Sequence, residues 1–121
     1  MSMIEKHELG KRGEAFALHL LVSKGFKILE TNWRHRKDEV DIIAKNNDYL
    51  VIVEVKTRST NYFGEPFIAV TKKKQGFLIR AANAYIEEND IDLECRFDII
   101  SIVFAENKYK VDHIEDAFYP E

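Results

Sequence analysis

Two short segments in the first half of the chain alternate apolar and charged residues, and a polar stretch separates them. The segments are Glu39-Val40-Asp41-Ile42-Ile43 and Ile52-Val53-Glu54-Val55-Lys56. Such alternation is typical of a strand with one buried face. The stretch between them, Lys45-Asn46-Asn47-Asp48, is typical of a turn. Together they predict a β-hairpin that has one apolar face and one charged face.

The pattern also predicts how the two strands of this hairpin pair. A loop of residues 46–49 places Lys45 opposite Leu50, so that partner numbers add up to 95. Asp41 then lies opposite Glu54, and Glu39 lies opposite Lys56. A slip of one residue would turn every side chain to the wrong face, so a continuous apolar set supports this register. That set consists of Val40, Ile42, Ala44, Val51, Val53 and Val55.

Two carboxylates are expected to face each other in this register. Directly opposed Cβ atoms lie about 4.5–5.5 Å apart, a separation at which like charges are destabilising. A divalent cation would turn the repulsion into chelation, because Mg²⁺ commonly binds one or two carboxylates with waters and phosphate oxygens. Lys56, on the same face, would orient a water or stabilise negative charge. The alternative is an exposed face with a Glu39–Lys56 ion pair and a solvated Asp41, which leaves the juxtaposition of Asp41 and Glu54 unexplained.

The composition indicates one globular domain spanning residues 1–121. A chain of this length with 45% hydrophobic residues can bury a substantial core. No signal-peptide pattern and no apolar run of membrane-spanning length are found, so a cytoplasmic protein without membrane association is expected. The single cysteine, Cys95, excludes an internal disulfide.

Charge is distributed unevenly along the chain. Residues 1–80 contain 15 Lys and Arg against 10 Asp and Glu, whereas residues 81–121 contain 3 against 11. Asymmetry of this kind indicates a charged partner, and phosphate binding requires a local basic patch rather than a basic protein. The alternative for each basic group is a solvated loop or helix face. The residues expected to hold a phosphate backbone without reading its sequence are Arg34, Arg36, Lys37, Arg58 and Lys74.

Hydrophobic periodicity predicts an α/β fold. Residues 5–24 are expected to form a helix that ends at Gly25, and residues 72–88 a second helix with Thr71 as its N-cap. Strands are expected at 26–34, in the two arms of the hairpin, at 96–104 and at 108–111, with a turn-rich loop at 61–66. The predicted order is a helix, a three-strand meander, a second helix and at least one further strand.

For several polar or small residues the sequence allows two interpretations. Gly10 and Gly13 either permit close approach of a backbone or a ligand to the first helix, or are tolerated at a cost of about 1 kcal/mol each relative to Ala. Glu14 is either an exposed helix acid or a third carboxylate directed at the hairpin. Asp98 is either another metal ligand or a structural partner of Arg96.

The ordered set of motifs resembles the YraN family of small bacterial proteins over essentially the whole chain. That family is similar to archaeal Holliday-junction resolvases, within the restriction-endonuclease-like superfamily marked by a D…(D/E)-x-K signature. The resemblance implies a restriction-endonuclease-like core, in which helices flank a mixed sheet. The matching residues are Gly10-x-x-Gly13-Glu14-x-x-Ala17, Asn32-Trp33-Arg34, Glu39-Val40-Asp41-Ile42-Ile43, Val53-Glu54-Val55-Lys56-Thr57-Arg58, Phe63-Gly64, Lys74, Ala81 and Arg96-Phe97-Asp98.

The resemblance implies a metal-dependent endonuclease that hydrolyses DNA, including branched or junction DNA, as a homodimer. Asp41 and Glu54, with the carbonyl of Val55, would bind Mg²⁺ or Mn²⁺. The competing hypotheses are a non-catalytic nucleic-acid-binding or adaptor module and a protein-interaction domain. The catalytic set that matches the superfamily consists of Asp41, Glu54, Lys56 and the helix-borne Glu14, with Glu39 positioning the lysine.

One residue departs from the family pattern. Asp38 stands where the family usually has Gly, in Lys37-Asp38-Glu39-Val40-Asp41. Asp tolerates the left-handed backbone conformation better than most residues, so we expect the turn to form. The substitution also adds a negative charge beside the expected metal site.

Overall fold

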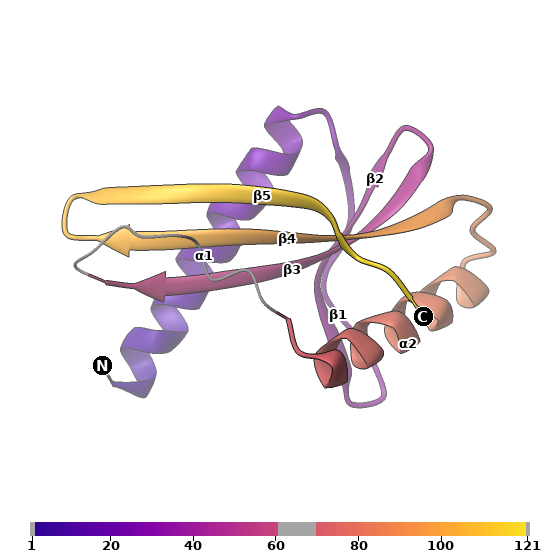
Figure 1. The fold of residues 1–121 in the computed structure, drawn as a ribbon, viewed down its shortest axis with the longest axis horizontal. Helices are drawn as coiled ribbons and strands as arrows, with labels where there is room; N and C mark the ends of the chain where they lie inside the picture. Colours follow the sequence, from indigo (N-terminus) through magenta and orange to yellow (C-terminus); the bar gives the residue numbers. More distant parts are fainter. Residues whose placement is uncertain (1, 61–69, 121) are drawn as a thin grey trace.

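The structure of this protein, a computed structural model, describes residues 2–60 and 70–120. Helix α1 (Met3–Ser23) leads into β1 (Lys27–His35), β2 (Asp38–Asn46) and β3 (Tyr49–Ser59); α2 (Lys72–Glu88) leads into β4 (Glu94–Ala105) and β5 (Lys108–Phe118) (Figure 1). The loop expected at 61–66, with Phe63-Gly64, lies outside the described residues. The α/β class predicted from the sequence is confirmed.

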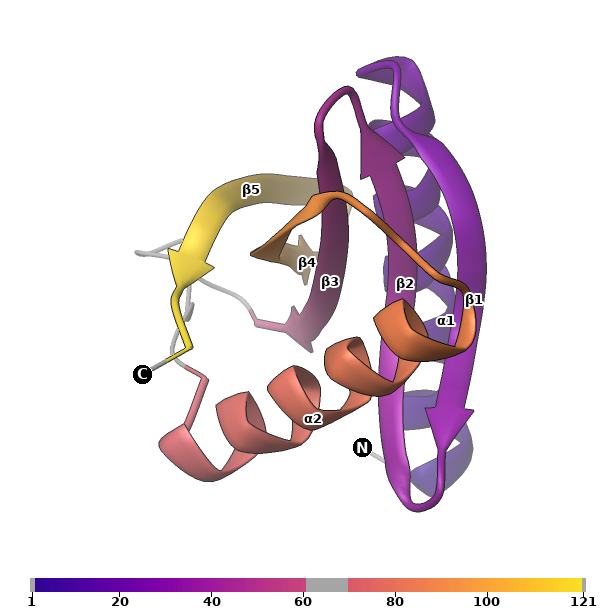
Figure 2. The same cartoon turned by 90° about the vertical axis from the view of Figure 1, so that its right-hand side faces the viewer.

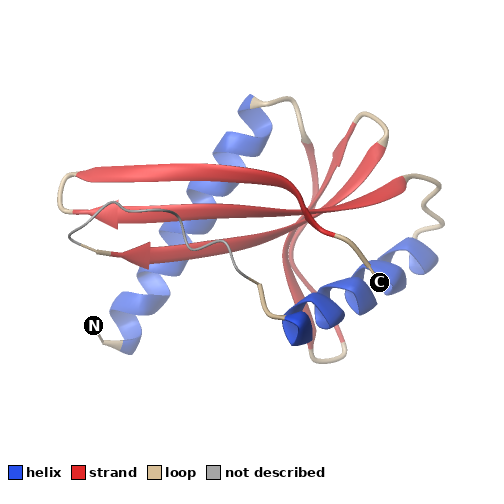
Figure 3. Cartoon of the chain, in the orientation of Figure 1, coloured by secondary structure: helices blue, strands red, loops and turns tan. Residues whose placement is uncertain are grey.

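The strands form one mixed sheet in the order β1-β2-β3-β4-β5. Neighbouring strands are antiparallel except for β3 and β4, which run parallel with α2 in the connection between them. Parallel neighbours require a crossover of this kind, since a tight turn cannot join them. The two helices lie on opposite faces of the sheet, as two orientations show (Figures 2 and 3). A mixed sheet flanked by helices is the arrangement expected for a restriction-endonuclease-like core.

The core consists of two apolar clusters, one on each face of the sheet. Strands β3 and β4 contribute to both, which explains why their sequences are nearly continuous apolar runs. The apolar face predicted for the hairpin is found under α1, except that Val40 packs on the α2 side. The α1 cluster includes Ala17, Leu21, Ile42, Ala44, Val51, Val53, Ile100 and Ile102. The α2 cluster includes Val40, Ile43, Leu50, Ile52, Leu78, Ala81, Ala82, Tyr85 and Phe97.

Most element boundaries agree with the sequence prediction, and β5 is the main exception. Helix α2 spans the predicted residues, and the Thr71 Oγ1 accepts the Lys74 N–H at 3.1 Å as an N-cap. Strand β5 continues seven residues beyond the predicted 108–111, to Phe118. Its second half is rich in charged residues, which hid the strand pattern. Within the described residues, neither helix combines the length and apolarity needed to cross a membrane.

A buried charge network holds β4, β5 and the end of α1 together. The fully buried Asp98 carboxylate accepts two hydrogen bonds from Arg96, both at 2.9 Å, and one from the Asp116 N–H at 3.0 Å. The His113 Nε2 lies 2.8 Å from the same carboxylate, and its Nδ1 lies 2.8 Å from the Lys24 Nζ. An ammonium group can only donate, so Nδ1 accepts and Nε2–H donates to Asp98. Asp98 is therefore a structural partner of Arg96, as one reading of the sequence had it.

Candidate functional site

A cavity of about 630 Å³ lies between the N-terminal half of α1 and the strands β1, β2 and β3. It brings together three of the catalytic candidates identified in the sequence: Glu14, Asp41 and Lys56. They come from α1, β2 and β3, and the packing of α1 on the β2–β3 hairpin brings Glu14 to the other two. The remaining lining residues are Lys6, His7, Gly10, Lys11, Asn32, Val55 and Thr57.

Asp41 is positioned at the end of the hairpin ladder. The predicted register is confirmed from Asn46 opposite Tyr49 to Ile42 opposite Val53, and the backbone pairing stops there, one position before Asp41. Beyond the ladder, the Val55 N–H donates a hydrogen bond of 2.8 Å to the Asp41 Oδ2. A side-chain carboxylate thus takes the place of a ladder carbonyl, which fixes Asp41 against β3.

Glu54 is the buried carboxyl of the site, with 8% of the residue exposed. Burial, and contact with the carboxyl of Asp41 beside it, raise the pKa of Glu54 to about 7, against the smaller opposing effects of Lys74 and Lys56. Its Oε2 is buried without a hydrogen-bond partner, and the Lys74 Nζ lies 3.5 Å away. An orphaned buried carboxylate oxygen beside a second carboxylate costs free energy unless a cation or a proton occupies the pair.

The Asp41–Glu54 pair fits a divalent cation held by few protein ligands. No cluster of three or more His, Cys, Asp or Glu side chains arranged to hold a metal is found in residues 2–60 and 70–120. Mg²⁺ nevertheless commonly uses one or two carboxylates and completes its shell with waters and substrate phosphate oxygens. The chemistry of these two donors suits Mg²⁺ or Mn²⁺ better than soft metals. Val55 lines the cavity, and coordination by its carbonyl stays a prediction.

Glu14 lines the same cavity from α1, and its carboxylate accepts a hydrogen bond from Asn32. The Asn32 Nδ2 donates a hydrogen bond of 2.8 Å to the Glu14 Oε1. Asn32 adopts a left-handed conformation (φ 50°) within β1, which Asn accepts more readily than most residues. Burial and the nearby charges of Asp41 and Glu39 raise the pKa of Glu14, whereas the hydrogen bond from Asn32 lowers it. Glu14 is thus held beside the pair, in reach of water in the cavity.

The structure corrects the expected role of Glu39. The sequence register placed Glu39 opposite Lys56, but the β2–β3 ladder ends before reaching that position. Glu39 instead lies opposite Arg34 on β1 and forms an ion pair with it at 3.2 Å. The structure therefore gives no support to Glu39 as the residue that positions Lys56. Lys56 lines the cavity, and its charge acts on Glu54.

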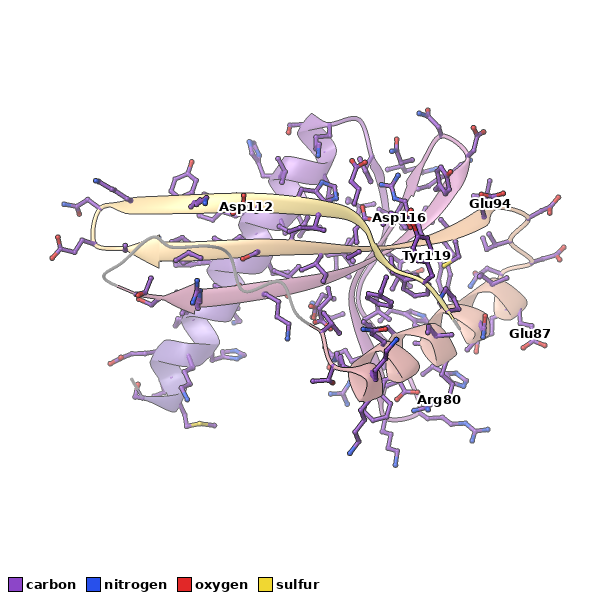
Figure 4. All side chains as sticks on the ribbon, viewed as in Figure 1. Arg80, Glu87, Glu94, Asp112, Asp116 and Tyr119 are labelled. Carbon is purple, nitrogen blue, oxygen red and sulfur yellow. The ribbon has the colours of Figure 1, made fainter. Side chains whose placement is uncertain are left out.

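Asp38 likewise differs from expectation. The left-handed residue of the β1–β2 turn is Arg36 (φ 58°), and Asp38 is the first residue of β2. Its side chain is buried and accepts two hydrogen bonds of 2.9 Å from Arg80, which extends from α2 (Figure 4). The expected extra negative charge beside the site is therefore neutralised by an ion pair that ties β2 to α2.

Replacing Asp38 with Gly is therefore expected to destabilise the protein rather than restore a turn. The change removes two charge-assisted hydrogen bonds and adds backbone freedom to a strand. Since Arg80 is half exposed, we expect the free energy of unfolding to fall by about 1–3 kcal/mol. Urea denaturation of the wild type and of Asp38→Gly measures this difference. Equal midpoints would show that the ion pair contributes nothing to stability.

The basic candidates are spread over several surfaces. Arg34 pairs with Glu39, Arg36 and Lys37 form the exposed tip of the β1–β2 hairpin, and Lys74 lies beside Glu54. Arg58 lines a second cavity next to the first. The basic residues of α1 that line the main cavity were not among the candidates predicted from the sequence. Their signal was helical spacing, because they share a face with Glu14: Lys6, His7 and Lys11.

Comparison with known proteins places the chain in one family. The family model described as "Uncharacterised protein family UPF0102" matches residues 13–102. A UPF0102 protein of Flavobacterium psychrophilum is 50% identical over 117 residues, covering 97% of this chain and 98% of that protein. A UPF0102 protein of Alkaliphilus oremlandii is 46% identical over 114 residues, covering 92% of this chain and 97% of that protein. The chain therefore belongs to UPF0102, the YraN family that its motifs resemble.

Proposed function

We propose that this protein is a metal-dependent endonuclease that hydrolyses phosphodiester bonds in DNA. The observation that carries the proposal is the Asp41–Glu54 pair, in which one buried carboxylate oxygen has no hydrogen-bond partner. Asp41 of this pair lines the main cavity together with Lys56 and the helix-borne Glu14. An acidic pair with a nearby lysine is the donor set that two-carboxylate metal hydrolysis of a phosphodiester requires.

Each residue has a distinct part in this mechanism. Asp41 and Glu54 would hold Mg²⁺ or Mn²⁺, which would polarise the phosphate as a Lewis acid and lower the pKa of an attacking water. The Val55 N–H holds the Asp41 carboxylate in place, and Lys74 favours the ionised form of Glu54. Lys56 stabilises the negative charge that develops on the phosphate oxygens.

In this mechanism Glu14 acts on the attacking water and not on the phosphate. Its Oε1 is already occupied by the Asn32 amide, so its remaining lone pairs are directed to the cavity solvent. Its raised pKa makes it more readily protonated than an ordinary glutamate near neutral pH. Glu14 thus orients water in the cavity and accepts its proton.

The substrate proposed is DNA, with branched or junction DNA as the form that the family resemblance implies. Phosphate contacts position a nucleic acid without reading its sequence. The proposed contacts are Arg34, Arg36, Lys37, Arg58 and Lys74, joined by the cavity residues Lys6, His7 and Lys11.

The test is cleavage of labelled four-way-junction, flap, single-stranded and linear duplex DNA in Mg²⁺, Mn²⁺ or EDTA. Wild-type protein is expected to cut at least one substrate in metal and none in EDTA. Asp41→Asn is expected to lower the rate at least about 10²-fold. The variant keeps an oxygen that can accept from the Val55 N–H, so it should fold normally. Circular dichroism of both proteins checks that point.

A different pattern would favour a different class of protein. Salt-dependent binding of DNA without cutting, in every metal, would overturn the nuclease proposal and favour an adaptor module. Cutting that survives in Asp41→Asn would place the catalytic site elsewhere or reveal a contaminating nuclease. Absence of salt-dependent binding altogether would favour a protein-interaction domain.

A further inference from the structure

The two glycines in the first half of α1 have different surroundings. A Cβ at Gly13 would overlap the side chain of Thr57, so this glycine is needed for α1 to approach β3 closely. A Cβ at Gly10 would meet no atom within 4 Å. Glycine lowers helix stability relative to Ala, and packing within the protein accounts for Gly13 only. Gly76 on α2 is equally open, so what distinguishes Gly10 is the pair of cavities that it lines.

Gly10 lies where two cavities meet. The main cavity of about 630 Å³ and a second one of about 330 Å³ share Lys6, Gly10 and Thr57. The first extends toward Asn32 and Asp41, and the second toward Arg58 and Ser59 at the end of β3. The two cavities therefore adjoin each other beside Gly10 of α1. We call the two cavities together the Gly10 groove.

Both basic and acidic side chains line the Gly10 groove. Lys6, His7 and Lys11 line the main cavity from α1, and His7 and Lys11, four positions apart, are neighbours on the helix surface. Arg58 lines the far end of the groove, and the acids Asp41 and Glu14 lie in its main cavity. Lys6 lies where the two cavities meet, between the acids in the main cavity and Arg58 in the second one. Cationic side chains that continue away from an acidic end match a polymer that carries one phosphate per residue, with one phosphate placed at the acids.

The size of the groove indicates whether the polymer binds as a single strand or as a double helix. Its main cavity falls in the range of small-ligand sites, roughly 300–1,000 Å³. A space of this size has room for a few nucleotides of one strand, whereas a double helix could bring only a backbone phosphate to its edge. We propose that the Gly10 groove binds an unpaired nucleic-acid strand, whose backbone crosses α1 at Gly10 and contacts Lys6 and Lys11. The inference rests on the proposed function for the identity of the anionic polymer, and it makes an unpaired strand, as at a flap, the substrate form.

The experiment measures binding of a labelled twelve-nucleotide oligothymidine and of a blunt duplex of equal length, in Mg²⁺, in the Asp41→Asn background. Gly10→Leu fills the groove and is expected to weaken single-strand binding at least about tenfold, with duplex binding changed less than about twofold. Lys11→Gln is expected to reduce the slope of log K against log salt by about 0.7, the value for one lost single-strand phosphate contact.

Gly76→Leu is the matched control. Gly76 is also a helix glycine with no atom within 4 Å of an added Cβ, and it lies on α2 away from the groove cavities. Both replacements are expected to raise the melting temperature by about 3–6 °C, because both remove a helix glycine. Only Gly10→Leu should weaken strand binding. Unchanged binding in Gly10→Leu, or equal weakening in both variants, would overturn the inference.

The inference and the proposed function fail in different ways. If wild-type protein cuts DNA in metal but Gly10→Leu binds and cuts single strands normally, the nuclease stands and the groove assignment is wrong. If no DNA is ever cut but single-strand binding depends on Gly10 and Lys11, the groove assignment stands and the hydrolytic proposal is wrong. Tighter binding of the blunt duplex than of the single strand by the parent protein also contradicts the groove assignment.

Discussion

Replacing Glu54 with Gln is expected to abolish metal-dependent hydrolysis and at the same time stabilise the metal-free protein at pH 8. The glutamine keeps the size of the side chain and can donate to the Asp41 carboxylate beside it. It removes a buried negative charge that the protein compensates only in part through Lys74, 3.5 Å away. It also removes one of two proposed metal ligands, so the rate should fall at least about 10²–10³-fold.

The stability effect has a definite pH dependence. The pKa of Glu54 is raised from 4.5 to about 7 in the folded protein. The folded state therefore binds the proton more tightly than the unfolded state, and the stability that this provides is complete below about pH 4.5. It is lost as the pH rises to about 7. At pH 8 we expect the free energy of unfolding of Glu54→Gln to exceed that of the wild type by about 1–3 kcal/mol. At pH 4.5 the two values should be equal.

Urea denaturation in EDTA at pH 4.5, 6 and 8 measures this difference. Adding Mn²⁺ at pH 8 should raise the unfolding midpoint of the wild type and leave that of Glu54→Gln unchanged, because only the wild type binds the ion. Glu94→Gln, at an exposed carboxylate near the start of β4 (Figure 4), is the matched control and should change neither quantity. A variant that is less stable than the wild type at pH 8 would show that Glu54 has a structural role instead.

Replacing Asp98 with Ala is expected to lower the free energy of unfolding by about 3–5 kcal/mol, the range for breaking a buried ion pair. The change leaves Arg96, whose side chain is 11% exposed, without its two hydrogen bonds. It also removes the acceptor for His113 and for the Asp116 N–H. Since the contacts of His113 and of the Asp116 N–H with Asp98 join the end of β5 to β4, we expect the C-terminal half of β5 to lose protection from hydrogen exchange.

Acid should remove the same contribution from the wild type. Burial alone would raise the pKa of Asp98, but the hydrogen bonds from His113, Arg96 and the Asp116 N–H together lower it below 3.8. Its contribution to stability is therefore complete above the unfolded value and is lost as the pH falls through the lower folded value. The stability difference between wild type and Asp98→Ala should shrink in that acidic window.

Asp112→Asn provides the control for Asp98→Ala. Asp112 lies on β5 (Figure 4), and its Oδ2 has no hydrogen-bond partner and is 3.9 Å from the Lys110 Nζ. Because Asn removes the charge from a buried oxygen that has no hydrogen-bond partner, this replacement should not lower the free energy of unfolding. If Asp98→Ala and Asp112→Asn behaved alike in urea denaturation, the network would not be the stabilising contact that its geometry indicates.

Several elements could be predicted because their signals are local. The hairpin register follows from a two-residue period and a short polar turn, and five of its pairs are confirmed. Helix α2 follows from its apolar spacing and the Thr71 cap. The second half of β5 could not be predicted, since its charged residues are satisfied by partners on β4 and α1 that are distant in the chain.

The sequence by itself determined the two central strands and the meeting of Asp41 with Glu54, because strand alternation and turn length act between neighbours in the chain. Only the tertiary structure decided which face of α1 meets the hairpin. That choice places Gly13 against Thr57, leaves Gly10 open and directs Lys6 and Lys11 to the cavity. The tertiary structure also decides that the β2–β3 ladder ends before Glu39, which pairs with Arg34. Helix packing and ladder ends depend on contacts between residues remote in sequence, and no local pattern specifies them.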